Sequence, residues 1–162
     1  MSADTLGLSA EPTVEVLAPV PLDLLLDARD HFSGRELALG SRAWEVFRRL
    51  DAIRTDHAVR VWIYASHNPD QPSPASATWT AYYVRCVDSM GGAHPDSEHF
   101  RSPIARPEDG LAYWAIYWHV EGLRQLEASE YQPVSQMRGL DQRKPYGRPF
   151  EPEGPILIEP VA

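Results

Sequence analysis

Residues 59–66 (VRVWIYAS), 79–88 (WTAYYVRCVD) and 111–123 (LAYWAIYWHVEGL) decide the fold of this chain. All three runs are rich in β-branched and aromatic residues, and turn-forming residues bound each of them, a pattern typical of strands. They hold four of the five tryptophans and five of the seven tyrosines. Strands with aromatic residues on both faces need a core on one side and a cover, a partner or a ligand on the other. The three runs therefore predict a small β-barrel with an aromatic surface.

The length of 162 residues indicates a single domain. We expect an extended leader over residues 1–20, where prolines oppose a helix and residues 13–17 (TVEVL) alternate like a short strand, and one domain over residues 21–162. No stretch reaches the roughly 20 apolar residues that a membrane-spanning helix needs. The first residues lack the positive region of a secretion signal, and a single cysteine, Cys86, cannot form an internal disulfide. We therefore expect a cytoplasmic protein without a membrane partner.

The charge balance limits the kind of partner. A net charge of −8 argues against a general attraction to a phosphate backbone, although a local basic face remains open. The basic residues are 14 arginines and one lysine, Lys144. Contacts to an anion are thus expected from arginine, which binds in a bidentate manner.

Other elements follow from local patterns. The spacing of apolar residues predicts an amphipathic helix over residues 41–54 and a shorter one over residues 21–29. Ser33 and Glu36 have the spacing of a capping box, which predicts another short helix after them. Residues 67–77 and 89–109 are expected to be loops, and the length of the second indicates a functional role. A helical turn is expected near residues 122–127, and residues 156–158 are expected as an edge strand that closes the barrel.

The strand faces suggest where a ligand binds. Alternation places Val61, Ile63 and Ala65 on one face of the first strand, opposite Trp62, Tyr64 and Ser66. In the third strand Trp114 shares a face with Trp118. If the core uses one face of each strand, the remaining aromatic side chains line a concave site on which a nucleobase stacks. The alternative is that every ring belongs to the core.

No strong catalytic signature is present: a nucleophile elbow, a phosphate-binding glycine loop and a zinc-protease motif are all missing. His94 and His99 are separated by Asp96 and Glu98, which is compatible with a metal site, but loop residues of this kind are more often solvated. His119 is expected to be partly buried and bonded to the backbone. We predict neither a metal nor a cofactor.

The order of several short motifs resembles the PUA-like superfamily, which includes the EVE and ASCH domains. The motifs are GSRAW at residues 40–44, IYAS at 63–66, AYYV at 81–84, HP at 94–95, RSP at 101–103 and VEGL at 120–123. The resemblance covers roughly residues 38–135. It implies an α+β fold, a small PUA-like β-barrel of five or six mostly antiparallel strands flanked by short helices. It also implies a cleft that recognises RNA or a modified nucleobase.

Matched residue by residue, the resemblance places Arg42 after the glycine at the helix start and places Tyr64 and Ser66 at the border of the cleft. Two departures argue against an enzyme. Gly40 stands where ASCH patterns have an acidic residue, and the lysine of the amidohydrolase branch has no match, since Lys144 lies far downstream.

These observations favour a non-catalytic module that binds a nucleobase, plain or modified, or a short RNA or DNA. Ser66 would read the base edge, and Arg42 or Arg101 would contact a phosphate. The predicted ligand-binding residues are Arg42, Trp44, Tyr64, Ser66, Trp79, Tyr83, Arg101 and Trp114. One alternative is a small hydrolase acting on a nucleoside-like amide, with His94, His119 or Glu121 as general base. Another is a protein-interaction adaptor that uses exposed tryptophan and tyrosine side chains as anchors.

Overall fold

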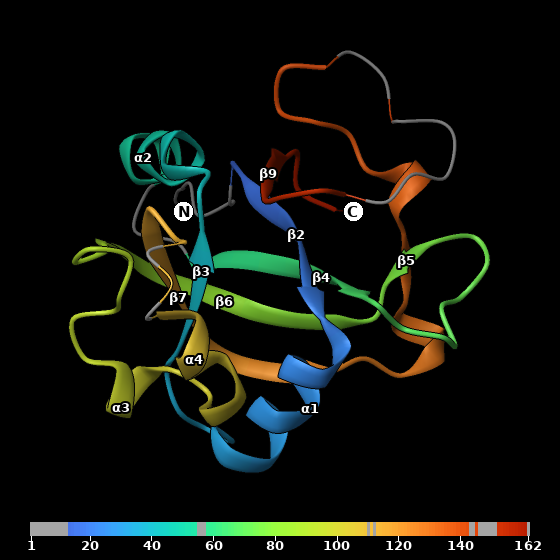
Figure 1. Ribbon diagram of the computed structural model, residues 1–162. Coiled ribbons are helices and arrows are strands. Elements are labelled where there is room, and N and C mark those ends of the chain that lie inside the picture. The colour runs from blue at the N-terminus through green and yellow to red at the C-terminus, as the bar shows by residue number, and fades with distance from the viewer. Residues whose placement is uncertain are drawn as a thin grey trace, which may run out of the picture.

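A curled six-stranded sheet forms the centre of the fold (Figure 1). The computed structural model describes residues 13–54, 58–109, 111, 113–142, 145 and 152–161. The strand order is β3-β7-β6-β4-β2-β9. The strands are β2 (Glu15–Pro21), β3 (Leu37–Ser41), β4 (Val59–Ser66), β6 (Trp79–Asp88), β7 (Ile116–Gln125) and β9 (Ile156–Ile158). A separate pair joins β5 (Ser76–Ala77) to β8 (Gln132–Pro133).

Short helices flank the sheet. α2 (Trp44–Ile53) lies at one end, and α1 (Leu22–His31), α3 (Ser97–Phe100) and α4 (Arg106–Asp109) gather at the other (Figure 1). Single 3-10 turns complete the fold at η1 (Pro103–Ala105), η2 (Ala128–Glu130) and η3 (Val134–Gln136). None of the helices among the described residues has the length and apolar character that crossing a bilayer requires.

The α+β class is confirmed, but the prediction of a closed, mostly antiparallel barrel is wrong. The sheet is a mixed half-barrel, because β2 runs parallel to β4 while the other neighbouring strands are antiparallel. Between β2 and β4 the chain passes through α1, β3 and α2, which is long enough for the crossover that parallel strands need. β9 is an edge strand as predicted, but it pairs with β2 and does not close a barrel.

Strand β2 is an interior strand, although residues 13–20 were expected to belong to a leader. It lies between β4 and β9, and Val16, Leu17 and Ala18 are fully buried. The part of the expected leader over residues 1–12 lies outside the described residues. Within β2, Pro19 and Pro21 oppose a helix, and an extended strand is the conformation they allow.

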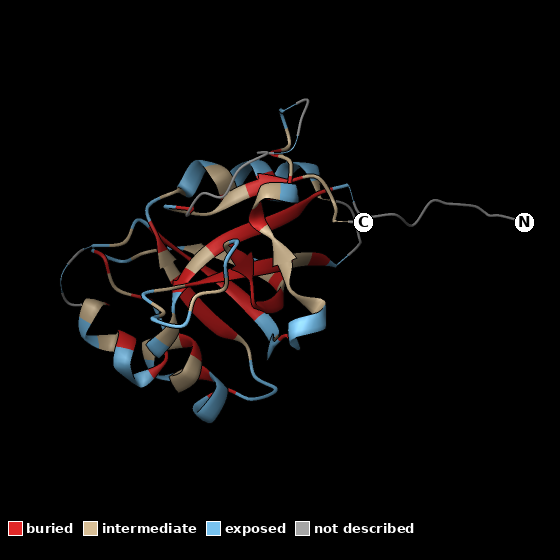
Figure 2. Cartoon of the chain, turned by 90° about the vertical axis from the view of Figure 1, so that its right-hand side faces the viewer, coloured by how far each residue is buried: buried red, intermediate tan, exposed pale blue. Residues whose placement is uncertain are grey.

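Two core clusters lie on opposite faces of β4 (Figure 2 shows the buried residues in red along the central strands). Val61, Ile63 and Ala65 belong to the larger cluster, whereas Trp62 and Tyr64 belong to the smaller one. The predicted alternation along this strand is therefore confirmed. Since both faces of the strand are covered, most of its aromatic surface is used for packing.

Three local predictions differ from the structure. Residues 37–41 form β3, not a helix, because they pair with residues 116–120 of β7 and the carboxylate of Glu36 bonds to other side chains. The following helix starts at Trp44, since Ser41 ends the strand and its hydroxyl accepts the Ala43 amide at 3.0 Å. β7 continues through Gln125 along β6, which replaces the helical turn expected near residue 122.

Candidate functional site

A cavity of about 440 Å³ lies at the C-terminal end of β2. Its apolar walls come from the end of β2, the start of α1, strand β3 and strand β7. They include Val20, Leu24, Leu39 and Trp118. Polar and aromatic side chains complete the lining: Arg42, Arg101, Glu108, Tyr113, Trp114 and Glu153. The volume falls in the range of pockets that hold small molecules.

The sheet topology creates this cavity. β2 and β4 are parallel, so both end at the same edge, where Pro21 pairs with Ser66. On its other side β2 has a partner only as far as Leu17, because β9 begins opposite that residue at Ile156. The last residues of β2, after Leu17, therefore have no strand partner on that side. In open sheets, ligands bind in the crevice beyond the carboxyl ends of parallel strands.

Trp114 forms the aromatic wall of the cavity and rests directly on the backbone of Gly40. A Cβ atom at Gly40 would lie 2.5 Å from the indole Cγ, Cδ1 and Nε1 atoms. The indole Nε1–H is buried and has no hydrogen-bond partner among the described residues. The ring of Tyr113 packs against the indole with 4.6 Å between the ring centroids. The guanidinium of Arg42 covers the Tyr113 ring at 4.1 Å from its centroid. Arg42 also donates to the Tyr113 carbonyl at 3.0 Å.

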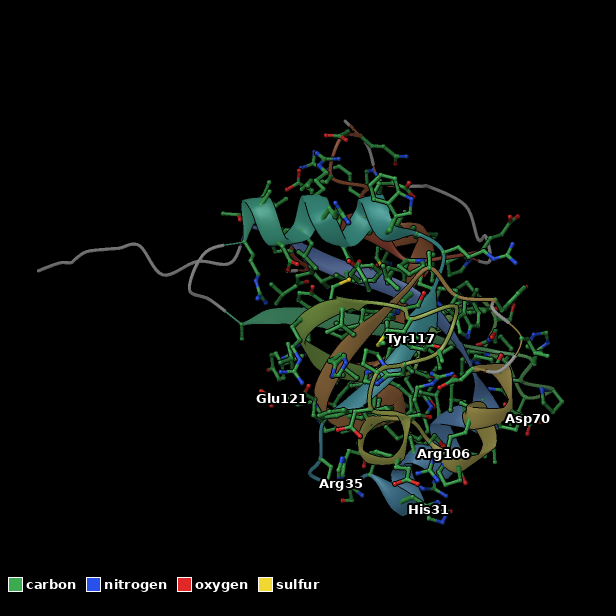
Figure 3. The ribbon with its side chains drawn as sticks, turned by 60° about the vertical axis from the view of Figure 1, so that its left-hand side comes forward. His31, Arg35, Asp70, Arg106, Tyr117 and Glu121 are labelled. Atoms are coloured by element: carbon green, nitrogen blue, oxygen red, sulfur yellow. The ribbon has the colours of Figure 1, made fainter. Side chains whose placement is uncertain are left out.

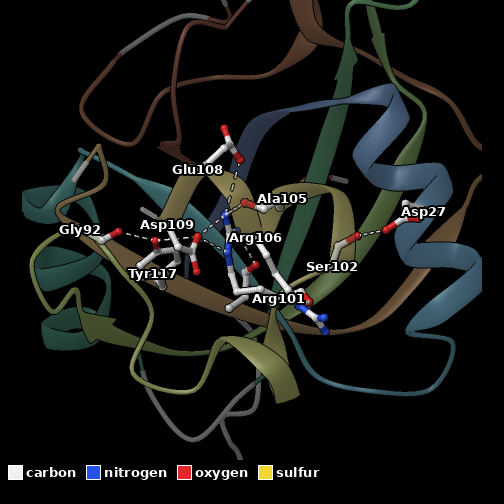
Figure 4. A network of polar contacts seen from close by, with 10 residues as sticks. Asp27, Gly92, Arg101, Ser102, Ala105, Arg106, Glu108, Asp109 and Tyr117 are labelled. Carbon is white, nitrogen blue, oxygen red and sulfur yellow. Dashed lines mark hydrogen bonds and ion pairs between the residues drawn. The ribbon is translucent and has the colours of Figure 1, made fainter. Parts of the chain in front are cut away.

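Arg101 is buried, and its guanidinium is engaged by the protein (Figure 4). Nε donates to Asp109 Oδ1 at 3.1 Å, Nη1 donates to the Ala38 carbonyl at 3.0 Å, and Nη2 donates to the Ala105 carbonyl at 3.2 Å. Glu108 lies 3.5 Å from Nη2. The geometry therefore gives Arg101 a structural role and does not support the expected phosphate contact.

Tyr117 supports this network from β7. Its ring lies 4.8 Å below the Arg101 guanidinium, and its hydroxyl lies 2.6 Å from the Gly92 carbonyl and 3.1 Å from Asp109 Oδ1. Burial, followed by the charge of Asp109, raises the pKa of Tyr117. The phenol is therefore neutral at pH 7 and acts as a hydrogen-bond donor.

Two further cavities adjoin the first one at Pro21, which lines all three. One, of about 560 Å³, lies against the start of α1 and includes His67 and Ile104. The other, of about 1050 Å³, includes Tyr64, Ser66 and Gln71. We call the three cavities together the Pro21 groove.

The structure brings five of the eight predicted ligand-binding residues to the Pro21 groove. Arg42, Arg101 and Trp114 line the first cavity, and Tyr64 and Ser66 line the third. Tyr64 contributes only an edge, because it is 3% exposed.

The other three predicted residues do not line the Pro21 groove. Trp79 is a core residue with 1% of its surface exposed. Tyr83 is also buried; its ring packs on Phe47 of α2 and its hydroxyl donates to Asp51 Oδ1 at 2.8 Å. Trp44 lies on the exposed side of α2, where the guanidinium of Arg48 covers its ring at 5.2 Å.

The segment over residues 89–109 was expected to be a loop, but it contains α3, η1 and α4 and packs on the sheet. Its His94 is buried against His119 of β7, with 3.0 Å between their Nε2 atoms. The Asp96 amide donates to His94 Nδ1 at 2.7 Å, so His94 carries its proton on Nε2 and donates to His119. His119 Nδ1 then donates to Glu36 Oε2 at 2.5 Å, a partner that the sequence did not indicate.

The histidine pair is neutral and lies outside the Pro21 groove. Burial, followed by the nearby His119 and Arg101, lowers the pKa of His94 to about 4. Burial also lowers the pKa of His119, against the opposing effect of Glu36. Glu121 lies at the periphery of the molecule, exposed on β7 (Figure 3). None of these three predicted general bases therefore faces the candidate site.

The possible metal site does not assemble. His99 Nδ1 bonds to the Asp96 carboxylate at 2.8 Å, while His94 turns inward to His119. Across the described part of the chain, no group of three His, Cys, Asp or Glu side chains is arranged to hold a metal ion.

Three residues of the first cavity were not singled out from the sequence: Glu108, Tyr113 and Glu153. Glu108 belongs to the 89–109 segment, whose length was the available signal. Tyr113 lies next to Trp114 and could have been found from the aromatic run. Glu153 gave no signal, because its position depends on how the chain returns to β9.

Comparison with known proteins adds no assignment. The chain matches no protein-family model, and no curated protein or solved structure is significantly similar to it.

Proposed function

We propose that this protein is a non-catalytic module that binds a flat heteroaromatic ligand, a nucleobase in plain or modified form, in the Pro21 groove. The observation that carries the proposal is the cavity of about 440 Å³, one wall of which is formed by Trp114, Tyr113 and Arg42. The resemblance to PUA-like domains, which rests on residues 38–135, points to the same kind of ligand.

The lining suits a flat ring. Apolar side chains from β2, α1 and β3 provide contact surface, and stacking of a base on an aromatic side chain contributes about 1–3 kcal/mol. Ser66 lines the adjoining cavity, and in the proposed complex its hydroxyl would bond to a polar edge of a larger ligand.

A hydrolase receives less support. Its predicted general bases are His94 and His119, which are buried away from the groove, and Glu121, which is exposed on β7. A general base must come within hydrogen-bond reach of the substrate, and these positions do not allow that for a substrate in the Pro21 groove.

Calorimetric titration with nucleosides and short oligonucleotides tests the proposal. We expect binding by the full chain and a loss of about tenfold or more in affinity for Trp114→Leu, as expected for loss of a stacking contact. Trp44→Leu is the matched control, since Trp44 is exposed on α2 and should leave affinity unchanged. The proposal would be contradicted if none of these ligands bound at millimolar concentration. It would also be contradicted if Trp114→Leu bound the ligand as tightly as the unchanged protein.

A further inference from the structure

We infer that the Pro21 groove selects an uncharged or positively charged ring that carries an exocyclic amino group, and that it rejects the phosphate-bearing form of the same ligand. This inference rests on the proposed function and specifies its ligand. It follows from the charges and the hydrogen-bonding groups that surround the groove.

The positive charge of the groove is largely neutralised. Of its two arginines, Arg101 is consumed by Asp109, Glu108 and two carbonyl groups. Arg42 remains, but its Nε–H is bonded to the Tyr113 carbonyl and its guanidinium lies on the Tyr113 ring. One partly engaged cation is thus the available positive charge among the described lining residues.

Carboxylates outnumber that cation. Besides Glu108, which is paired with Arg101, Glu153 lines two of the cavities and Asp23 lines the one beside α1. Glu153 is exposed and has no ion-pair partner among the described residues. The whole chain also carries a net charge of −8. A phosphate group that enters the groove is therefore repelled by the carboxylates that line it and by the net charge of the protein.

The usual anion position in this groove is already filled. α1 begins at Leu22, and the N-terminus of a helix attracts anions through its free amide groups. Here the carboxylate of Asp23 accepts the Leu24 amide at 2.8 Å. A phosphate that approached this amide would have to displace the Asp23 carboxylate.

The groove instead offers acceptors. Pro19 and Pro21 have no N–H, so the ladder with β4 must use the backbone groups of their neighbours Ala18 and Val20. Both prolines line the groove beyond the residues of β2 that pair with β9, so neither presents an N–H donor to a ligand there. The carboxylates of Glu153 and of Glu108, the second of which lies beside Arg101, line the first cavity, so the amino group of a ligand can donate to them.

The experiment compares nucleosides with their 5′-monophosphates by calorimetry at low salt, using adenosine and cytidine as amino-bearing rings and uridine as the ring without an amino group. We expect adenosine or cytidine to bind at least about tenfold more tightly than its own monophosphate and more tightly than uridine. Raising the salt concentration should narrow the gap between nucleoside and monophosphate, because salt screens exposed charges.

Glu153→Gln should also narrow that gap, since it removes a carboxylate that has no ion-pair partner among the described residues and keeps the size of the side chain. Glu121→Gln is the matched control, because Glu121 is exposed on β7 and lines none of the three cavities. A monophosphate that binds as tightly as its nucleoside, or uridine that binds as tightly as cytidine, overturns the inference and leaves the proposed function standing. A complete lack of binding by all six compounds removes both.

Discussion

The imidazole rings of His94 and His119 meet through their Nε2 atoms at 3.0 Å, and this contact fastens the 89–109 segment to strand β7. The contact is one step in a chain of bonds that runs from the Asp96 amide through both rings to Glu36. Each ring donates once and accepts once, so neither can take up another proton without losing a bond. Arg85 also contacts Glu36, and Arg101 and Asp109 lie near His94, so the pair is enclosed by both signs of charge.

Acid should therefore destabilise the protein before its carboxylates titrate. The folded state lowers the pKa of His94 from 6.5 to about 4, so the unfolded chain binds more protons between these values. The contribution of His94 to the free energy of unfolding should be constant above about pH 6.5 and should fall by up to about 1.4 kcal/mol per pH unit below it. Chemical denaturation measured from pH 7.5 to pH 5 checks this slope.

The variant His94→Gln tests the origin of that slope. Glutamine retains a donor and an acceptor but does not titrate, so the fall between pH 6.5 and pH 5 should become shallower. His31→Gln controls for the loss of a histidine as such, because His31 is exposed on α1. If His94→Gln and the unchanged protein lose stability in parallel, the histidine pair is not the cause.

The buried guanidinium of Arg101 should contribute strongly to the unfolding free energy of the protein. Arg101→Met keeps much of the side-chain volume but leaves Asp109 as a buried charge without its partner. Removing one member of a buried ion pair costs about 3–5 kcal/mol of unfolding free energy. Thermal and denaturant unfolding measure the loss.

Arg49 provides the comparison for that prediction. It forms a bidentate pair with Asp141, with distances of 2.6 and 2.8 Å, but the pair is exposed to solvent. Exposed pairs contribute little because water screens them, so Arg49→Met should have a much smaller effect than Arg101→Met. Equal effects of the two substitutions would show that burial is not what makes Arg101 important.

Gly40 should be required for the position of Trp114. An added methyl group at Gly40 would lie 2.5 Å from three indole atoms, so Gly40→Ala must push the ring away from the backbone. We expect a lower melting temperature and a weaker ligand response, because the indole forms the wall of the cavity. Gly154→Ala is the matched control for the melting temperature alone, since nothing lies within 4 Å of its added Cβ atom but Gly154 lines the same cavity. An unchanged near-ultraviolet circular dichroism signal for Gly40→Ala would count against the close contact.

Local sequence patterns predicted the strands whose neighbours lie close along the chain. The runs at residues 59–66 and 79–88 coincide with β4 and β6, because β-branched and aromatic residues favour strands and the two pair with each other. β2 was missed as part of the sheet, since its place depends on a parallel partner more than 40 residues away. The short β3 was missed because a capping-box pattern preceding it indicated a helix, while its pairing with β7 is a long-range effect.

The same distinction holds for the site. Arg42 was predicted from the resemblance to PUA-like domains and Trp114 from the aromatic face of the third strand, and both line the first cavity. Trp79 and Tyr83 were expected at the site, but the face of β6 that carries them is covered by the larger core and by Phe47 of α2. Alternation shows which residues share a face, but it does not say which face a helix will cover.

Substitution at Tyr83 separates a role in core packing from a role in ligand binding. Tyr83→Phe removes the bond from the phenol to Asp51 but keeps the ring that packs on Phe47, so unfolding free energy should fall by about 0.5–1.5 kcal/mol. Ligand affinity should not change, because Tyr83 lines none of the three cavities. Trp114→Leu should give the opposite pattern, with its main effect on affinity. A Tyr83 variant that binds nucleosides more weakly at full stability would place the ligand against β6 and not in the Pro21 groove.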